Sequence, residues 1–232
     1  MEPTWNEVDE YFSRRLIPPD PALEQALADS TAAGLPAINV TPLQGKLLAQ
    51  MVQVSGSRRV LEIGTLGGYS AIWMGRALPA NGSLVTLEIN PRNADVAQRN
   101  VDRAGLTDRV RVVVGPAGET LTKMMADRVA PFDFVFIDAD KENSLPYFEA
   151  ALRLSHKGTI IVVDNVVREG AIIDTNTADT MVRGVQMLAD HLAGEDRVSA
   201  TAIQTVGAKG YDGFILALVI SDKGLGISAR ES

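Results

Sequence analysis

The alternation of short apolar runs with helix-like stretches, which begins near residue 58, constrains the fold of this chain most. Apolar and β-branched residues gather at residues 60–63, 83–88, 110–114, 132–138 and 159–164. Each run is followed by an amphipathic stretch. These stretches predict helices over residues 69–78, 90–104, 144–154 and 177–192, and one more helix that follows residue 114 and ends near residue 124. Strands that are separated by helices predict right-handed crossovers and a parallel sheet with helices on both faces.

The last two apolar runs break this alternation. Residues 198–206 and 214–220 both have strand-like composition, and only the seven residues 207–213 lie between them. A crossover helix does not fit in that length, so these two strands should form an antiparallel hairpin. The sequence therefore predicts an α/β fold with a doubly wound, Rossmann-like sheet of seven strands, of which the last is antiparallel.

Extra helices are expected before the sheet begins. Thr4 and Glu7 form a capping box, and the pairs Asp20-Pro21 and Thr41-Pro42 each place a capping residue before a proline at the first helical position. We expect one domain over residues 1–232. Residues 1–40 should form a helical cap, and residues 58–221 should form the Rossmann-like core.

Composition excludes several kinds of chemistry. The 232 residues include no cysteine and only two histidines, which excludes thiolate nucleophiles, cysteine-based zinc sites and three-histidine metal sites. The net charge of −7 argues against a nucleic-acid partner. We expect no membrane span, because no apolar run approaches about 20 residues. The start, Met1-Glu2-Pro3-Thr4-Trp5, does not resemble a signal peptide, and a cytoplasmic location is expected.

A glycine-rich turn follows the first strand, in the segment Glu62-Ile63-Gly64-Thr65-Leu66-Gly67-Gly68-Tyr69-Ser70. Glycines let a ligand approach the backbone, and the helix after them offers free N–H groups. Leu66 stands where the dinucleotide pattern Gly-x-Gly-x-x-Gly requires its second glycine. The carboxylate of Glu62 disfavours a pyrophosphate and favours a cationic ligand, although a tight turn without a ligand is the simpler reading.

Glu88 ends the second strand, 24 residues after Gly64. An acidic side chain at about this distance accepts hydrogen bonds from the hydroxyls of a ribose. Strand ends are often polar, so Glu88 alone is a weak signal. Together with the glycine turn, it indicates an adenosine-containing ligand.

Acidic residues also end the fourth and fifth strands. Asp138 closes one and Asp164-Asn165 closes the other, and the carboxyl ends of parallel strands face one crevice. Oxygen ligands of this kind suit Mg²⁺ best, with Ca²⁺ or Mn²⁺ as alternatives. Taken separately, Asp138 could simply cap a helix and Asp164-Asn165 could start a turn.

Lys141 follows Asp138 by three residues and should lie in the loop above the sheet. A divalent cation nearby would favour the neutral amine through repulsion of like charges. A neutral lysine can act as a general base. The alternative is an ordinary solvated lysine on the surface.

Three segments together resemble the cation-dependent class I O-methyltransferases, which include catechol and caffeoyl-CoA O-methyltransferases. These segments are VLEIGTLGGYS at residues 60–70, FDFVFIDADK at residues 132–141 and IIVVDN at residues 160–165, and the reversed last strand agrees with them. The resemblance covers about residues 36–221. It implies S-adenosylmethionine (SAM) as the methyl donor, a divalent cation, a small aromatic acceptor with vicinal hydroxyls, and a homodimer.

The resemblance also implies a role for individual residues. For the donor these are Val40, Glu62, Gly64, Thr65, Ser70, Glu88, Ala117 and Asp138. It further implies Asp138, Asp164 and Asn165 as metal ligands, Asp138 and Lys141 as catalytic residues with Lys141 as the base, and Asp140 as a residue near the acceptor.

Two other functions remain open at this level. A non-catalytic SAM-binding scaffold could keep the fold without the reaction, and an NAD-dependent oxidoreductase could use a similar sheet. The natural acceptor is not apparent. Residues 166–176 and Tyr211-Asp212 should line the mouth of its pocket, and Arg168, the one basic candidate there, is expected to be simply exposed.

Overall fold

The structure is a computed structural model that describes residues 3–225. Two short segments lie outside the described residues. They are residues 1–2, the start of the segment compared with signal peptides, and residues 226–232, the end of the expected domain. Between residues 3 and 225, no helix combines the length and the apolar character needed to cross a bilayer.

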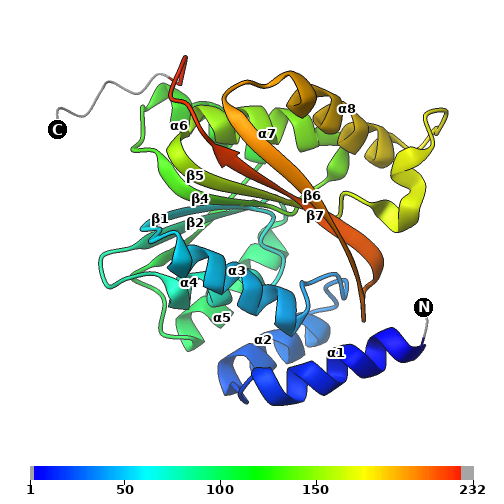
Figure 1. Ribbon diagram of the computed structural model, residues 1–232. Coiled ribbons are helices and arrows are strands. Elements are labelled where there is room, and N and C mark those ends of the chain that lie inside the picture. The colour runs from blue at the N-terminus through cyan, green and yellow to red at the C-terminus, as the bar shows by residue number, and fades with distance from the viewer. Residues whose placement is uncertain (1–2, 226–232) are drawn as a thin grey trace.

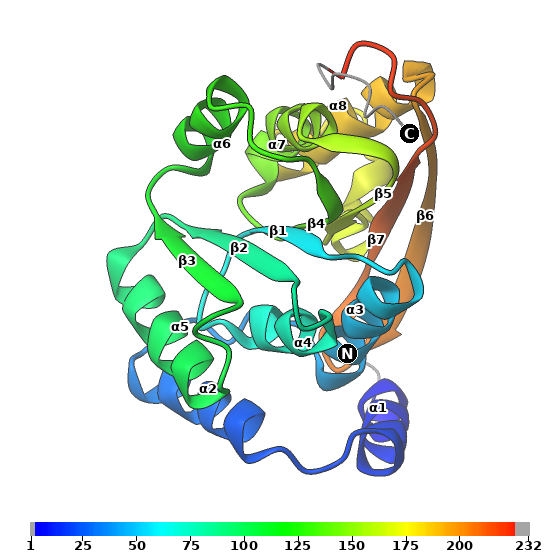
Figure 2. The same cartoon turned by 90° about the vertical axis from the view of Figure 1, so that its left-hand side faces the viewer.

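Seven strands form a single sheet in the order β3-β2-β1-β4-β5-β7-β6 (Figures 1 and 2). Neighbours among β1 to β5 are parallel, whereas β7 is antiparallel to both β5 and β6. The strands are β1 (Arg59–Ile63), β2 (Ser83–Glu88), β3 (Val110–Val114), β4 (Phe132–Ile137), β5 (Ser155–Asp164), β6 (Val198–Gly207) and β7 (Gly210–Val219). The predicted doubly wound sheet with a reversed last strand is confirmed.

Helices cover both faces of this sheet. Figure 2 shows α3, α4 and α5 on one face and α6, α7 and α8 on the other, and Figure 1 shows α1 and α2 outside the first layer. The α-helices are α1 (Pro3–Leu16), α2 (Pro21–Ala32), α3 (Pro42–Val54), α4 (Tyr69–Ala77), α5 (Pro91–Arg103), α6 (Ala117–Ala126), α7 (Ser144–Arg153) and α8 (Thr180–Gly194). Two 3-10 helices, η1 (Lys141–Asn143) and η2 (Arg168–Ile173), follow β4 and β5.

The apolar runs fold as strands because their alternate side chains enter two separate cores. In β4, Val135 and Ile137 pack in the core under α6, α7 and α8, whereas Phe134 and Phe136 pack in the core under α2 to α5. All four side chains are almost completely buried. A strand that is buried on both faces needs an apolar residue at every position, which explains the continuous apolar run.

Several boundaries differ from the sequence-based prediction. β5 begins at Ser155 rather than at residue 159, because Ser155 already pairs with Phe132 of β4. α1 begins at Pro3, so Thr4 lies inside the helix and does not cap it.

The connection between β6 and β7 is a turn of only Ala208 and Lys209, because Gly207 and Gly210 pair at its base and the strands stay paired up to them. The last helix begins at Thr180 rather than near Thr177, because the carboxylate of Asp179 accepts hydrogen bonds from Met181 N and Val182 N and caps it there.

The order of the strands reverses between β1 and β4, which is where this class of sheet binds ligands beyond the carboxyl ends of its strands. Gly64 N donates to Leu87 O of β2 at 3.0 Å, and Asp138 N donates to Ile63 O of β1 at 2.8 Å. A β-carbon at Gly64 would collide with the Asp138 carbonyl. Only glycine therefore lets the ends of β1 and β4 approach this closely.

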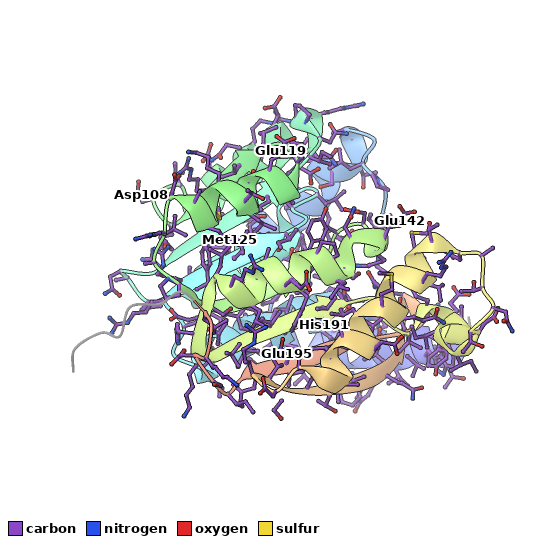
Figure 3. The ribbon with its side chains drawn as sticks, turned by 90° about the horizontal axis from the view of Figure 1, so that it is seen from above. Asp108, Glu119, Met125, Glu142, His191 and Glu195 are labelled. Carbon is purple, nitrogen blue, oxygen red and sulfur yellow. The ribbon has the colours of Figure 1, made fainter. Side chains whose placement is uncertain are left out.

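A second glycine sets the distance between α8 and the turn that carries Lys141. A β-carbon at Gly184 would collide with the carbonyl oxygen of Lys141 and with Glu142 Cα. Thr180 also donates a hydrogen bond to the Glu142 side chain, which Figure 3 labels at the end of α7 nearest α8. The position of Lys141 thus depends on close packing against α8.

We predict that Gly184→Ala destabilises the protein even though alanine favours helices more than glycine does. Overpacking of this kind costs about 1–3 kcal/mol, and each kcal/mol lowers Tm by about 2–4 °C in a chain of this size. The matched control is Gly194→Ala in the same helix, where nothing lies within 4 Å of the added methyl group. Equal Tm changes in the two variants, measured by calorimetry, would contradict the prediction.

Candidate active site

The turn after β1 has an unusual backbone conformation. Gly64, Leu66 and Gly68 have φ values of 99°, 50° and 84°, and Gly68 caps α4 without a side-chain hydrogen bond. Buried Asn100 of α5 donates to Gly67 O at 2.9 Å and holds the turn from outside. The first N–H groups of α4 are therefore free of any side-chain cap and available to a ligand.

Glu62 is a fully buried acid below this turn, with 0% of its surface exposed. Its carboxylate accepts hydrogen bonds from the hydroxyls of Ser70 and Thr86, both at 2.6 Å. Burial raises the pKa of Glu62 to about 8, and the charges of Asp138 and Glu88 act in the same direction against these two hydrogen bonds. A cationic ligand would favour the ionised carboxylate.

Glu88 is buried at the end of β2 and is held by backbone donors. Its carboxylate accepts hydrogen bonds from Leu66 N at 2.8 Å and from Asn90 N at 2.9 Å. Each carboxylate oxygen has two lone pairs, so acceptor capacity remains for a ligand. This geometry fixes the side chain beside the glycine turn.

A cavity of about 470 Å³ opens above the turn, and we call it the Gly64 cavity. Most of the donor-site residues predicted from the sequence line it, namely Val40, Gly64, Thr65, Ser70, Glu88, Ala117 and Asp138. Glu62 lies beneath the wall and reaches it through Ser70. The structure therefore brings this predicted set together around one cavity.

Lys141 is buried at the same edge of the sheet, with only 5% of its surface exposed, so it is not a solvated surface lysine. Its Nζ lies 3.0 Å from Asp138 Oδ1, and its carbonyl accepts a hydrogen bond from Ser144 Oγ at 2.8 Å. Both Lys141 and Asp138 line the Gly64 cavity. An amine that is buried and held in this way has a defined position from which to exchange a proton.

Asp164 is a second buried carboxylate close to Asp138. Gln44 of α3 donates to Asp164 Oδ2 at 2.7 Å. Burial and then the negative charge of Asp138 raise the pKa of Asp164, while the charge of Lys141 lowers it. Next to it, Asn165 has a φ of 56°, an uncommon conformation for a residue other than glycine.

The donor set of Asp138, Asp164 and Asn165 fits a hard divalent cation. Its carboxylate and amide oxygens are hard ligands, and the ammonium of Lys141 offsets only part of the charge of the two carboxylates. Across residues 3–225, no cluster of three or more His, Cys, Asp or Glu side chains suited to a metal is found. The set here contains two carboxylates, and its third member is an amide.

A second cavity of about 430 Å³ adjoins the first, and we call it the Asp164 cavity. Asp164, Gln44, Lys209 and Asp212 line it. The two cavities share one wall, formed by Ile38, Asn39, Val40, Asn165 and Arg168. Two molecules could therefore bind side by side, one in each cavity, with Asn165 between them.

Several residues of the site differ from the sequence-based expectation or were missed. Asp140, expected near the acceptor, lines the Gly64 cavity with Asp138 and Lys141 and accepts a hydrogen bond from Tyr147 OH at 2.8 Å, and its role stays a prediction. Burial and Asp140 raise the pKa of Tyr147. Gln44 and Lys209 were not singled out, although Gln44 follows the Thr41 cap by one helical turn and Lys209 lies between two glycines. Arg168 is partly buried in the shared wall rather than simply exposed.

Comparison with known proteins identifies the family. A family model described as O-methyltransferase matches residues 19–220. Catechol O-methyltransferase of Mycobacterium tuberculosis is 50% identical over 222 residues, which cover 94% of this chain and 98% of that protein.

Two solved structures match closely as well. An O-methyltransferase of Bacillus cereus in complex with SAH has a TM-score of 0.92 at 53% identity, covering 93% of this chain and 98% of that one. The O-methyltransferase TomG of Streptomyces achromogenes in complex with SAM has a TM-score of 0.92 at 46% identity, covering 95% and 100%. The chain therefore belongs to the class I O-methyltransferases that include catechol O-methyltransferase, and it is a SAM-dependent enzyme of that family.

Proposed function

We propose that the protein transfers a methyl group from SAM to one hydroxyl of a small aromatic acceptor with vicinal hydroxyls, and that the reaction depends on a divalent cation. The observation that carries this proposal is that Asp138 and the buried amine of Lys141 line the Gly64 cavity, Asp164 lines the adjoining cavity, and Asn165 lies in the wall that the two share. The relative named catechol O-methyltransferase supports the acceptor class.

The Gly64 cavity is the proposed site of SAM. The buried carboxylate of Glu62 suits a ligand that carries an ammonium and a sulfonium. Ser70, which donates a hydrogen bond to this carboxylate, lines the cavity between Glu62 and the ligand. Glu88 accepts hydrogen bonds from the ribose, and Ala117 lies against the adenine at the start of α6. Val40, Gly64 and Thr65 complete the contacts with the donor.

The Asp164 cavity is the proposed site of the acceptor. When bound, a divalent cation supplies Lewis acidity that orients two neighbouring hydroxyls and eases loss of the proton from one of them. Asp138, Asp164 and Asn165 would hold it, and Gln44 keeps the Asp164 carboxylate in place through its hydrogen bond. Mg²⁺ is the proposed ion, and Ca²⁺ or Mn²⁺ would also suit these oxygen ligands.

Lys141 is the proposed base. In its neutral form, which a divalent cation beside it would favour through repulsion of like charges, its Nζ takes the proton of the attacking hydroxyl. The oxygen forms a bond to the methyl carbon, and the bond from that carbon to sulfur breaks. Asp138 positions the amine through their contact at 3.0 Å. The protein otherwise contributes alignment of oxygen, carbon and sulfur, because a reaction of this kind is accelerated mainly by holding its reactants in line.

The family assignment replaces the two alternatives left open by the sequence. A dehydrogenase reading requires a complete dinucleotide glycine pattern, and Leu66 interrupts it. A scaffold without activity would be expected to lose a metal ligand or the base. The presence of Asp138, Lys141, Asp164 and Asn165 around the two adjoining cavities supports an active enzyme.

In the absence of the donor, the buried carboxyl group of Glu62 should lower the free energy of unfolding. Its pKa in the folded protein is about 8, above the ordinary 4.5. The folded state therefore keeps a proton that the unfolded chain loses, and this group's contribution to stability falls as pH rises from about 4.5 to about 8. We predict that Glu62→Gln raises Tm relative to the ligand-free wild type, by an amount that grows over this range and then levels off.

Thermal denaturation followed across pH checks this prediction. Glu119→Gln, which changes a glutamate exposed on α6, serves as the control and should show no growing difference (Figure 3). A Tm difference for Glu62→Gln that stays constant with pH would contradict the assignment of a neutral buried acid.

Removal of the cation should abolish turnover. We predict that EDTA or Asp138→Ala eliminates methylation of a catechol, and that added Mg²⁺ restores the EDTA-treated wild type but not the variant. Asp108→Ala, a change to an exposed carboxylate, is the control (Figure 3). Full activity in EDTA, measured by mass spectrometry of the methylated product, would refute metal dependence and leave the proposed SAM site intact.

The role of Lys141 can be separated from its charge. Lys141→Met should lower kcat by about 10²–10⁴, the usual contribution of a general base. Lys141→Arg keeps the positive charge beside Asp138 but cannot give up its proton, so it should be as impaired as Lys141→Met. Near-normal kcat in Lys141→Arg would show that the lysine acts through its charge alone.

A further inference from the structure

Two cationic side chains reach the Asp164 cavity from different elements. Arg168 comes from the segment after β5, and Lys209 comes from the turn between β6 and β7. Within residues 3–225, neither side chain forms an ion pair with a carboxylate. Lys209 Nζ donates to Ala37 O at 2.6 Å, while Arg168 Nε is buried and has no hydrogen-bond partner among the described residues.

The acids of the same cavity are already engaged. Asp212 Oδ1 accepts hydrogen bonds from Val167 N and Arg168 N, both at 3.0 Å, and Asp9 Oδ2 accepts one from Ala208 N at 2.8 Å. Asp164 is bonded to Gln44. Among the described residues the two cations therefore form no ion pair, whereas Asp9, Asp164 and Asp212 are held by N–H donors.

The backbone around Arg168 is held in an uncommon conformation. Asn165, Arg168 and Glu169 have φ values of 56°, 55° and 56°, which residues other than glycine rarely adopt. Asp212 stabilises this segment from β7 through its two hydrogen bonds. Such strained segments gather at ligand sites, where the surrounding structure enforces them. Arg168 is thus positioned in the wall that the two cavities share.

Lys209 lies within electrostatic range of the proposed metal ligands. Partial burial lowers the pKa of Lys209, and the charge of Asp138 raises it. The Asp164 cavity thus has Asp164 at the strand tips and, at its rim, the two cations beside the hydrogen-bonded carboxylates of Asp9 and Asp212. Its volume of about 430 Å³ is enough for one aromatic ring with a short substituent.

We infer that the acceptor is an anionic catechol, in which the ring carries a carboxylate that Lys209 and Arg168 bind while the vicinal hydroxyls face Asp138 and Asp164. This inference rests on the proposed function and narrows it to an acceptor of defined charge. The ammonium of Lys209 has three N–H donors, so it can bind the carboxylate while it keeps its contact with Ala37 O. Lys209 and Arg168 are specificity-determining residues, not catalytic ones.

The test compares 3,4-dihydroxyphenylacetate with its methyl ester. The methylene group insulates the ring, so the two compounds differ in charge while their reacting hydroxyls are almost equally acidic. We expect kcat/KM of the wild type to favour the acid by about tenfold or more, the effect of one or two charge-assisted contacts. The amine of the same skeleton, 3,4-dihydroxyphenethylamine, should be the poorest of the three.

Variants assign this preference to the two cations. Lys209→Met keeps the apolar stem and should lower the acid-to-ester ratio of kcat/KM several-fold, and combining it with Arg168→Gln should bring the ratio near one. Lys209→Arg should retain the wild-type ratio. Lys223→Met, beyond the other end of β7, changes an exposed lysine and is the matched control. Because Lys209 lies in an exposed turn, its variants carry the test even if Arg168→Gln fails to fold.

The outcomes distinguish the two levels of the argument. A wild type that methylates acid and ester equally, or a ratio that Lys209→Met leaves unchanged, overturns the anionic acceptor and leaves the proposed function standing. A purely structural role for Lys209 would lower turnover of both compounds together and would also overturn it. Failure to methylate any of the three catechols in the presence of SAM and Mg²⁺ overturns the proposed function and this inference with it.

Discussion

The crowding of carboxylates at the tips of neighbouring strands is the constraint on which the rest of the site depends. Glu62, Asp138 and Asp164 end or adjoin β1, β4 and β5, and the charge of Asp138 acts on both of the others. Lys141 offsets only part of this charge. Burial in this way disfavours the charged forms of the acids, and either a proton or a nearby cation relieves it. The site thus suits the cationic donor of this family on one side and the proposed divalent cation on the other.

Close backbone packing is what brings these groups together. Gly64 lets β1 meet β4 beneath Asp138, and Gly184 lets α8 press against the turn of Lys141. Neither glycine bears a functional group, yet each sets a distance on which the chemistry depends. Because these contacts are made with backbone atoms, the two glycines set the positions of the backbone segments that carry Asp138 and Lys141.

Much of the site could be predicted from the sequence, because the topology of the sheet determines which strand ends lie at the same edge. Alternating strands and helices imply that the carboxyl ends of the strands share one edge, which is enough to bring Glu88, Asp138 and Asp164 together. Gln44, Lys209 and the burial of Arg168 could not be predicted, because these residues reach the site through tertiary contacts with no periodic signal. The homodimer and the cytoplasmic location stay predictions. The exposed aromatic side chains of Tyr11 and Phe12 on α1 are compatible with a partner surface.

The opposite charges at the two ends of the Asp164 cavity also bear on orientation. A ring with a carboxylate at one end and vicinal hydroxyls at the other has two ways to enter, and the acids Asp138 and Asp164 repel its carboxylate from the inner end. Lys209 and Arg168 attract it to the rim. For the proposed anionic acceptor, long-range charge would therefore select the orientation before any close contact forms, and it would place a hydroxyl, not the carboxylate, beside Lys141. On this view, the rim acts on which oxygen meets the donor as well as on how tightly the acceptor binds.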